Sequence, residues 1–196
     1  MSDRKPYVGG NWKMFTNKTT GAELTRGVAD GLLRLTGCDV AIFPPFPYLL
    51  GTKSILRDRG SSIRLGAQDV YSHPDGAFTG EVSVAMLADC GVQVVLCGHS
   101  ERRHVIKEPD ELVNAKLHAV LEGGLEPILC IGETLEERTK GGTDEVTERQ
   151  LRAGLAEITA DAAARVVIAY EPVWAIGTGK TATPADVQDV HAKVRT

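Results

Sequence analysis

The sequence has 196 residues, of which 42% are hydrophobic and 24% are charged, and its formal net charge at pH 7 is -4. A chain of this length can form one domain with a well-packed core and is short for two, so we predict a single domain over residues 1–196. The mildly acidic balance gives no broad basic surface, which excludes a nucleic acid or an anionic membrane as an expected partner.

The compartment is predicted from the apolar segments and the cysteines. Residues 1–14 lack the apolar core of a signal peptide, and no apolar run is long enough to cross a bilayer. The four cysteines show no C-x-x-C spacing, which favours reduced thiols over disulfides or a zinc site. They are Cys38, Cys90, Cys97 and Cys130. We therefore expect a cytoplasmic protein without a metal.

Short apolar runs alternate with helical stretches along the whole chain. The runs do not alternate cleanly between apolar and polar residues, which is typical of parallel strands that are covered on both faces. We predict six strands, at Tyr7–Gly10, Asp39–Phe43, Arg64–Ala67, Gln93–Cys97, Pro127–Ile131 and Val166–Tyr170.

Helix-start signals mark several of the intervening stretches. Thr134 and Glu137 have the spacing of a capping box, in which each side chain binds a free backbone donor of the first turn. Thr183 and Pro184 fit the N-cap and first positions of a final helix. A further helix is predicted over Asp110–Leu121, before two consecutive glycines.

A repeating strand–helix–strand pattern predicts a parallel α/β fold. The pattern alone fits both an open doubly wound sheet and a closed barrel. A dinucleotide-binding sheet would require G-x-G-x-x-G directly after a strand, which this sequence lacks there, so we favour the barrel. A (β/α)8 barrel needs eight units and the sequence predicts six, which indicates an incomplete or unusually closed barrel.

Polar residues follow the carboxyl ends of the predicted strands, where barrel enzymes build their active sites. They are Asn11, Lys13, Gln68, His99, Glu133 and Glu171. Asn11 and Lys13 are two residues apart and project to one side of an extended chain. A lysine at this place can hold an anion, but taken alone an ordinary solvated lysine is the simpler explanation.

His99 and Glu171 are the candidates for acid–base chemistry. His99 precedes a predicted helical turn, whose N-terminus would favour a neutral imidazole that can donate to a carbonyl. Glu171 caps an apolar strand, and partial burial is expected to raise its pKa toward that of a useful base. The alternatives are a structural histidine and a carboxylate paired with a cation. The other histidines are assigned no function: His73, His104, His118 and His191.

The segment Pro172–Lys180 has an apolar tip and two glycines. This composition suits a lid that closes as a unit and presents backbone N–H groups to a phosphate. Its ending is similar to a Walker A loop, but that motif needs a glycine five residues before Gly179, where Trp174 stands. A nucleotide site is therefore excluded.

Six segments, taken together, resemble the triosephosphate isomerase family in their order and spacing. They are NWKM at 11–14, AQDV at 67–70, GAFTGE at 76–81, GHSERR at 98–103, CIGE at 130–133 and AYEPVWAIGTG at 169–179. The similarity runs from about Tyr7 to Thr196. One departure is Asp69, which stands where the family commonly has asparagine.

The resemblance implies an isomerase that interconverts dihydroxyacetone phosphate and D-glyceraldehyde 3-phosphate through an enediolate, in glycolysis and gluconeogenesis. It implies that Glu171 is the base and that His99 is the neutral electrophile, with no cofactor. It also implies that Lys13 and Asn11 bind the substrate and that Gly177 offers a backbone N–H to the phosphate.

Two supporting residues follow from the same resemblance. Glu101 is expected to pair with Lys13, and Thr79 is expected to reach a partner's active site from the loop 69–82, which predicts a homodimer. The family barrel also has strands 7 and 8, whose loops hold the phosphate in barrels of this type. We therefore expect the activity of the 196-residue chain to be impaired. The alternative is a non-catalytic truncated fragment or scaffold that associates through open sheet edges.

Overall fold

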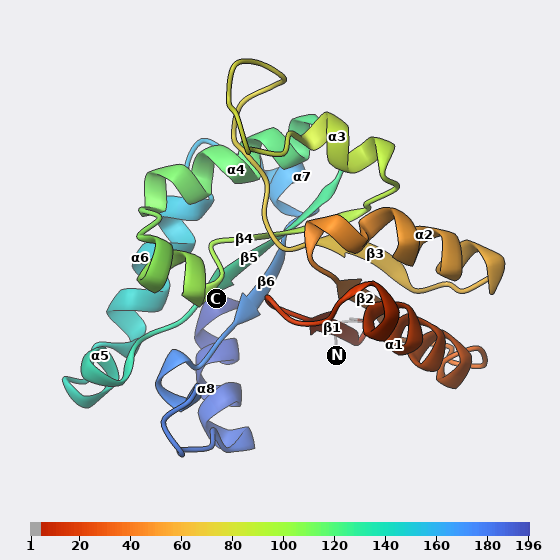
Figure 1. Cartoon of the computed structure of the whole chain (residues 1–196). Helices are drawn as coiled ribbons and strands as arrows, with labels where there is room; N and C mark the ends of the chain where they lie inside the picture. Colours follow the sequence, from red (N-terminus) through yellow and green to blue (C-terminus); the bar gives the residue numbers. More distant parts are fainter. Residues whose placement is uncertain (1–4) are drawn as a thin grey trace. The chain divides into compact units, whose positions relative to one another are not determined.

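A computed structural model describes residues 5–196, and the chain divides into two compact units. The first unit contains the described residues up to Leu96 together with 122–126, and the second contains 97–121 and 127–196. Figure 1 shows the strands and helices of each, and the two units are described separately.

The first unit is built from parallel strands linked by helices. Its elements are β1 (Tyr7–Asn11), α1 (Lys18–Gly31), β2 (Asp39–Phe43), η1 (Phe46–Tyr48), α2 (Leu49–Asp58), β3 (Arg64–Ala67), α3 (Val84–Asp89) and β4 (Val94–Cys97), whose last residue belongs to the second unit. β1 pairs with β2, β2 with β3, and β3 with β4, all in parallel. Phe43 is 1% exposed and forms part of the core.

The second unit contains the last two strands. Its elements are η2 (Arg102–Ile106), α4 (Asp110–Glu122), β5 (Glu126–Ile131), α5 (Leu135–Thr139), α6 (Thr143–Gly154), α7 (Ala160–Ala163), β6 (Val167–Tyr170), η3 (Val173–Ala175) and α8 (Pro184–Val194), with the ends of α4 and β5 in the first unit. β5 and β6 are parallel, and Ile131 lies opposite Tyr170.

The strands follow one another in sequence order within each unit: β1-β2-β3-β4 in the first and β5-β6 in the second. A doubly wound sheet instead reverses its strand order at a switch point. Sequential order is the barrel arrangement, so the predicted α/β class and barrel family are confirmed.

All six predicted strands are present, and the differences are confined to their ends. β2 and β3 have the predicted bounds, whereas β1 includes Asn11, which lies opposite Phe43. β4, β5 and β6 begin at Val94, Glu126 and Val167, one residue away from the prediction. Strand ends are decided by pairing with a neighbour, which local sequence does not report.

The predicted helix caps are confirmed. The Thr134 side chain accepts a hydrogen bond from the Glu137 N–H, and the Glu137 carboxylate accepts one from the Thr134 N–H. Thr183 caps α8, with Pro184 at its first position. The predicted helix at 110–121 is α4, one residue longer.

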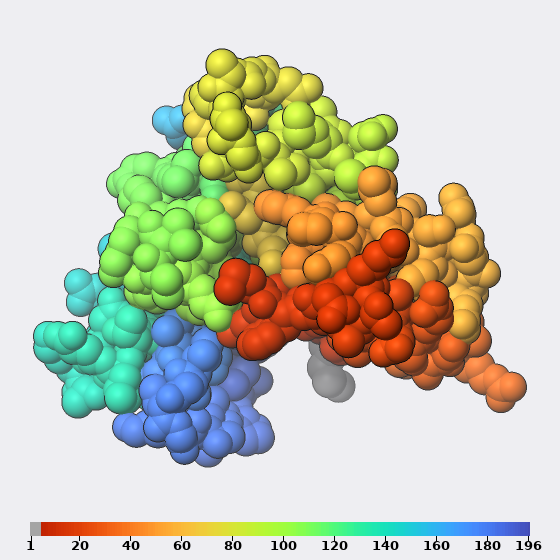
Figure 2. Space-filling view, in the orientation of Figure 1, coloured from red at the N-terminus to blue at the C-terminus, as the bar shows by residue number. Residues whose placement is uncertain are grey.

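The loop after β3 protrudes from the first unit (Figures 1 and 2). A hydrogen bond from the Tyr71 N–H to the Val82 carbonyl closes it. Its own aromatic side chains pack together, with ring centroids of Tyr71 and Phe78 4.7 Å apart and those of His73 and Phe78 5.4 Å apart. The loop is therefore ordered by internal contacts.

The four cysteines are free thiols, of which Cys97 and Cys130 are buried and Cys38 and Cys90 are partly exposed. Across residues 5–196, no helix combines the length and the apolar character needed to cross a membrane. In the same residues, no group of three or more histidine, cysteine and carboxylate side chains could hold a metal ion.

Candidate active site

His99 and Glu171 meet in the second unit. His99 follows β4 and Glu171 follows β6, and their side chains are 11% and 19% exposed. The Nε2 atom of His99 lies 3.0 Å from Oε1 of Glu171. The second carboxylate oxygen, Oε2, accepts a hydrogen bond of 3.0 Å from the Ser100 N–H. The structure thus joins the two residues that the sequence selected for acid–base chemistry.

The hydrogen bonds of His99 define its tautomer. The backbone N–H of Glu101 donates to Nδ1 over 3.3 Å, which makes Nδ1 an acceptor. A neutral ring with a lone pair on Nδ1 carries its proton on Nε2, the atom that faces Glu171. The helical turn predicted after His99 supplies this N–H, and it continues into η2. With Nδ1 accepting from the backbone, His99 is arranged to donate through Nε2 toward Glu171.

The predicted rise in the pKa of Glu171 is wrong. Burial raises the pKa of this carboxyl, but hydrogen bonding to His99, the electrostatic attraction of His99 and hydrogen bonding to Ser100 together outweigh burial, so the pKa lies below the usual value of 4.5. Sequence reasoning identified the desolvation correctly and missed the two donors. Glu171 is a firmly ionised carboxylate in this arrangement.

Asn11 and Lys13 lie together in the first unit. The Asn11 side-chain oxygen accepts a hydrogen bond from the Lys13 N–H over 2.9 Å. Lys13 has a φ of 51°, a left-handed conformation that is uncommon for a residue with a side chain. Gln68 stabilises this turn, because its side-chain nitrogen donates to the carbonyls of Lys13 and Phe43, both over 2.8 Å.

The segment 172–180 is anchored at its beginning and exposed at its tip. Trp174 is 6% exposed, whereas residues 176–180 are exposed. Thr178 donates through its hydroxyl to the Trp174 carbonyl over 2.7 Å. Gly177, directly before Thr178, has a φ of 68°, which favours glycine. This is the arrangement expected of a lid with a fixed hinge and a free tip.

We compared the sequence with protein families and with known proteins to establish which family it belongs to. The family model described as triosephosphate isomerase matches residues 6–196. The triosephosphate isomerase of Carboxydothermus hydrogenoformans is 53% identical over 192 residues, covering 98% of this chain and 76% of that protein. That of Dechloromonas aromatica is 50% identical over 192 residues with the same coverage, and that of Roseiflexus sp. (strain RS-1) is 50% identical over 194 residues, covering 98% and 75%.

This chain belongs to the triosephosphate isomerase family. The resemblance drawn from the six sequence segments is thereby confirmed. The chain spans about three quarters of the length of these relatives.

Two residues of the family pattern are predicted to support the site. Glu101 contacts His99, with its Oε2 3.5 Å from Nδ1, and its pairing with Lys13 stays a prediction. Thr79 is exposed on the protruding loop, and its contact with a partner subunit also stays a prediction. Asp69, the departure from the family pattern, is buried at 6% exposure.

A buried carboxylate supports the hinge, and sequence reasoning assigned it no role. Glu133 is fully buried and accepts hydrogen bonds from Arg138 at 3.0 Å, from Tyr170 at 3.1 Å and from Thr143 at 3.2 Å. Arg138 also lies 4.2 Å above the Trp174 ring. Burial and the nearby Glu133 raise the pKa of Tyr170 to about 12, so this hydroxyl stays a donor at neutral pH.

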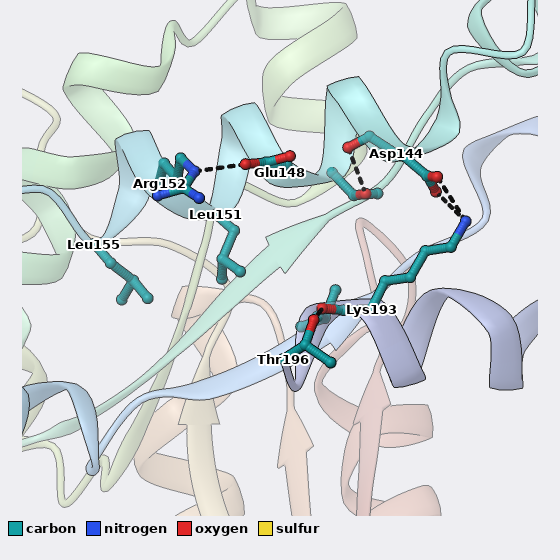
Figure 3. Close-up of a pocket in the computed structure, with 9 residues that line it drawn as sticks. Asp144, Glu148, Leu151, Arg152, Leu155, Lys193 and Thr196 are labelled. Carbon is teal, nitrogen blue, oxygen red and sulfur yellow. Dashed lines mark hydrogen bonds and ion pairs between the residues drawn. The ribbon is translucent and has the colours of Figure 1, made fainter.

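The second unit also contains a cavity that neither His99 nor Glu171 lines. A cavity of about 740 Å³ is lined by residues of α6 and α8 and of the segments that follow them. Figure 3 shows Lys193 of α8 reaching Asp144 of α6, at 2.6 Å, and Arg152 bonded to Glu148. The charged residues that line this cavity pair with one another, and the lining does not include His99 or Glu171, so we assign the cavity no part in the chemistry.

We predict that Glu171 stabilises the fold in a pH-dependent manner. Its pKa is lower in the folded chain than in the unfolded one, so its contribution is fully present above about pH 4.5 and is lost as the pH falls through the folded pKa. Urea unfolding of wild type and Glu171→Gln between pH 3 and 7 should show a difference that is largest near neutrality and shrinks in acid. Glu122→Gln, at an exposed position, measures the general effect of removing a carboxylate. A difference independent of pH would contradict the assignment.

We predict that Arg138→Met lowers the free energy of unfolding by about 3 kcal/mol. The substitution leaves the Glu133 carboxylate buried without its cation, and such losses cost about 3–5 kcal/mol. Arg152→Met is the matched control, since Arg152 is 78% exposed and its pair with Glu148 contributes less than about 1 kcal/mol. Equal denaturation midpoints for the two variants would show that Glu133 does not depend on Arg138.

Proposed function

We propose that this chain interconverts dihydroxyacetone phosphate and D-glyceraldehyde 3-phosphate, with Glu171 as the base and His99 as the neutral electrophile. The observation that carries the proposal is the 3.0 Å contact between His99 Nε2 and Glu171, with Nδ1 of the ring occupied by a backbone N–H. The same division of roles is established for triosephosphate isomerases and is transferred here by family membership.

The reaction moves one proton between neighbouring carbons. Glu171 takes a proton from C1 of dihydroxyacetone phosphate while His99 Nε2–H donates a hydrogen bond to the oxygen on C2. The electron pair of the broken C–H bond forms the enediolate. Glu171 then returns the proton to C2, and the hydroxyl proton shifts from O1 to O2, which gives the aldehyde.

The low pKa of Glu171 is compatible with this role. In the proposed complex the substrate oxygen replaces Glu171 as the acceptor of the His99 N–H. The carboxylate then loses one of the two partners that lower its pKa and keeps the Ser100 N–H, while burial, the largest single cause and one that raises the pKa, remains. Binding of the substrate would therefore make Glu171 a stronger base when the base is needed.

Three further residues are proposed to bind the substrate. Lys13 provides local positive charge in a protein whose net charge is -4, and its left-handed backbone supports a functional rather than an incidental position. Asn11 orients that turn through its bond to the Lys13 N–H. Gly177 offers its backbone N–H to the phosphate from the exposed tip of the lid.

The assembly, the domain organisation and the compartment are also part of the proposal. The protruding loop 69–82 is proposed to mediate a homodimer, with Thr79 reaching the partner. Its support is the internal order of the loop together with the 39% exposure of Phe78, a large apolar side chain at its tip. We further propose that residues 1–196 act as a single domain and that the protein is cytoplasmic.

A second candidate function is a non-catalytic scaffold that associates through a sheet edge. It is favoured by the exposure of β1, where Val8 is 56% exposed and Gly9 is also open to solvent. Unpaired strand edges are sites where another chain can add. This function requires assembly and no turnover, so one assay separates the two.

We predict that the purified chain isomerises D-glyceraldehyde 3-phosphate and that Glu171→Gln lowers kcat by about 10³-fold, within the range for removal of a general base. His99→Gln should lower kcat by about 10²-fold, because its amide still donates a hydrogen bond. Both variants are purified beside wild type, so contaminating host enzyme appears as the same rate in all three. Equal rates in all three proteins would refute the proposed enzymatic function and leave the scaffold as the remaining candidate.

A further inference from the structure

Gly132, the residue after β5, lies against the backbone of Glu171. A Cβ atom built on Gly132 would be 1.8 Å from the Glu171 carbonyl oxygen and 2.8 Å from its carbonyl carbon, whereas real Cβ contacts below 3.0 Å essentially never occur. Gly132 is not among the glycines with a positive φ. The lack of a side chain is therefore required by space, and the neighbour that requires it is the backbone of the proposed base.

The backbone of Gly132 is itself held in place by α6. The Gln150 side chain, 3% exposed, accepts from the Gly132 N–H over 2.8 Å and donates to the Gly132 carbonyl over 3.3 Å. The preceding residue, Ile131, accepts a hydrogen bond of 2.8 Å from the Glu171 N–H. The end of β5 is thus fixed to α6 on one hand and to Glu171 on the other.

We propose that Gly132 and Gln150 are positioning residues that set the place of the Glu171 carboxylate. Because the neighbour of Gly132 is backbone, a methyl group there cannot be accommodated by rotating a side chain and must displace residue 171. The carboxylate would then leave the 3.0 Å contacts with His99 and the Ser100 N–H. The expected loss of kcat rests on the proposed function. The displacement of the Glu171 carboxylate does not, because it can be measured without turnover.

The titration of Glu171 is a direct readout of its position. The groups that face its carboxylate are His99, the Ser100 N–H and the buried Cys130 thiol. Burial, followed by the charge of Glu171, raises the pKa of Cys130 to about 12, so this thiol is neutral throughout the relevant range. A carboxylate moved away from His99 and Ser100 should titrate at higher pH, because those hydrogen bonds are what lower its pKa.

The experiment compares Gly132→Ala with two other variants. Gln150→Met removes both hydrogen bonds to Gly132 with little change in size. Gly154→Ala is the matched control, because its Cβ would lie 2.7 Å from Leu129 of β5, a similar steric insertion that meets a side chain rather than Glu171. For each variant we would measure kcat and KM, the thermal midpoint, and the titration of Glu171 by carboxyl carbon NMR.

We expect Gly132→Ala to lower kcat about 10- to 100-fold with a smaller change in KM, since a misplacement of about 1 Å can cost about 10²-fold. Its Glu171 should titrate at higher pH than in wild type, and Gln150→Met should shift it in the same direction by less. Gly154→Ala should lower only the thermal midpoint.

The proposal would be overturned if Gly132→Ala had the same kcat and the same Glu171 titration as wild type. It would also be overturned if Gly154→Ala lost as much kcat as Gly132→Ala. If Gly132→Ala does not fold, Gln150→Met tests the proposal instead. A Glu171 that titrates there at the wild-type pH would overturn the proposal. If wild type itself turns over no substrate, the titration still tests the positioning, so that failure of the proposed function is separable from failure of this inference.

Discussion

The parallel register of β5 and β6 is the constraint on which the candidate site depends. It places Ile131 opposite Tyr170, so the residues that follow, Gly132 and Glu171, leave the sheet next to each other. Parallel strands end at the same edge, which is why residues remote in sequence converge there. The hydrogen bond from the Glu171 N–H to Ile131 extends the pairing by one position. A one-residue slip would turn the carboxylate to the opposite face of the sheet.

Two carboxylates follow these strands, and their surroundings give them different properties. Glu133 is fully buried and is compensated by Arg138 and by neutral hydroxyl donors, so its partners are fixed side chains of the fold itself. Glu171 is held by an imidazole and a backbone N–H, without a fixed cation among the hydrogen bonds described for it. A substrate can replace such a partner at small cost, whereas breaking a buried ion pair would leave an uncompensated charge. The surroundings of Glu133 therefore suit a structural role, and those of Glu171 suit proton transfer.

The lid combines a rigid base with a tip that has few contacts. Trp174 is fixed by its indole N–H to Tyr170 and by the Arg138 guanidinium above its ring. Beyond Thr178 the segment is exposed. Segments with few buried contacts open at low free energy, and segments anchored in a core do not. If the segment acts as the proposed lid, its movement would be confined to the exposed tip, while Trp174 stays anchored after β6.

The sequence by itself determined the six strands, the helix caps and the identity of the candidate residues. These are local properties: apolar runs of strand length, a hydroxyl three residues before a carboxylate, and polar residues directly after strands. The sequence did not determine the sign of the pKa shift of Glu171, the tautomer of His99, the role of Glu133 or the need for glycine at 132. Each of these depends on a partner brought near by folding, such as the Ser100 N–H, which is 71 positions from Glu171. Burial can be inferred from an apolar neighbourhood in the sequence, but the donors that offset burial are chosen by tertiary packing, and they decide the charge state on which the chemistry depends.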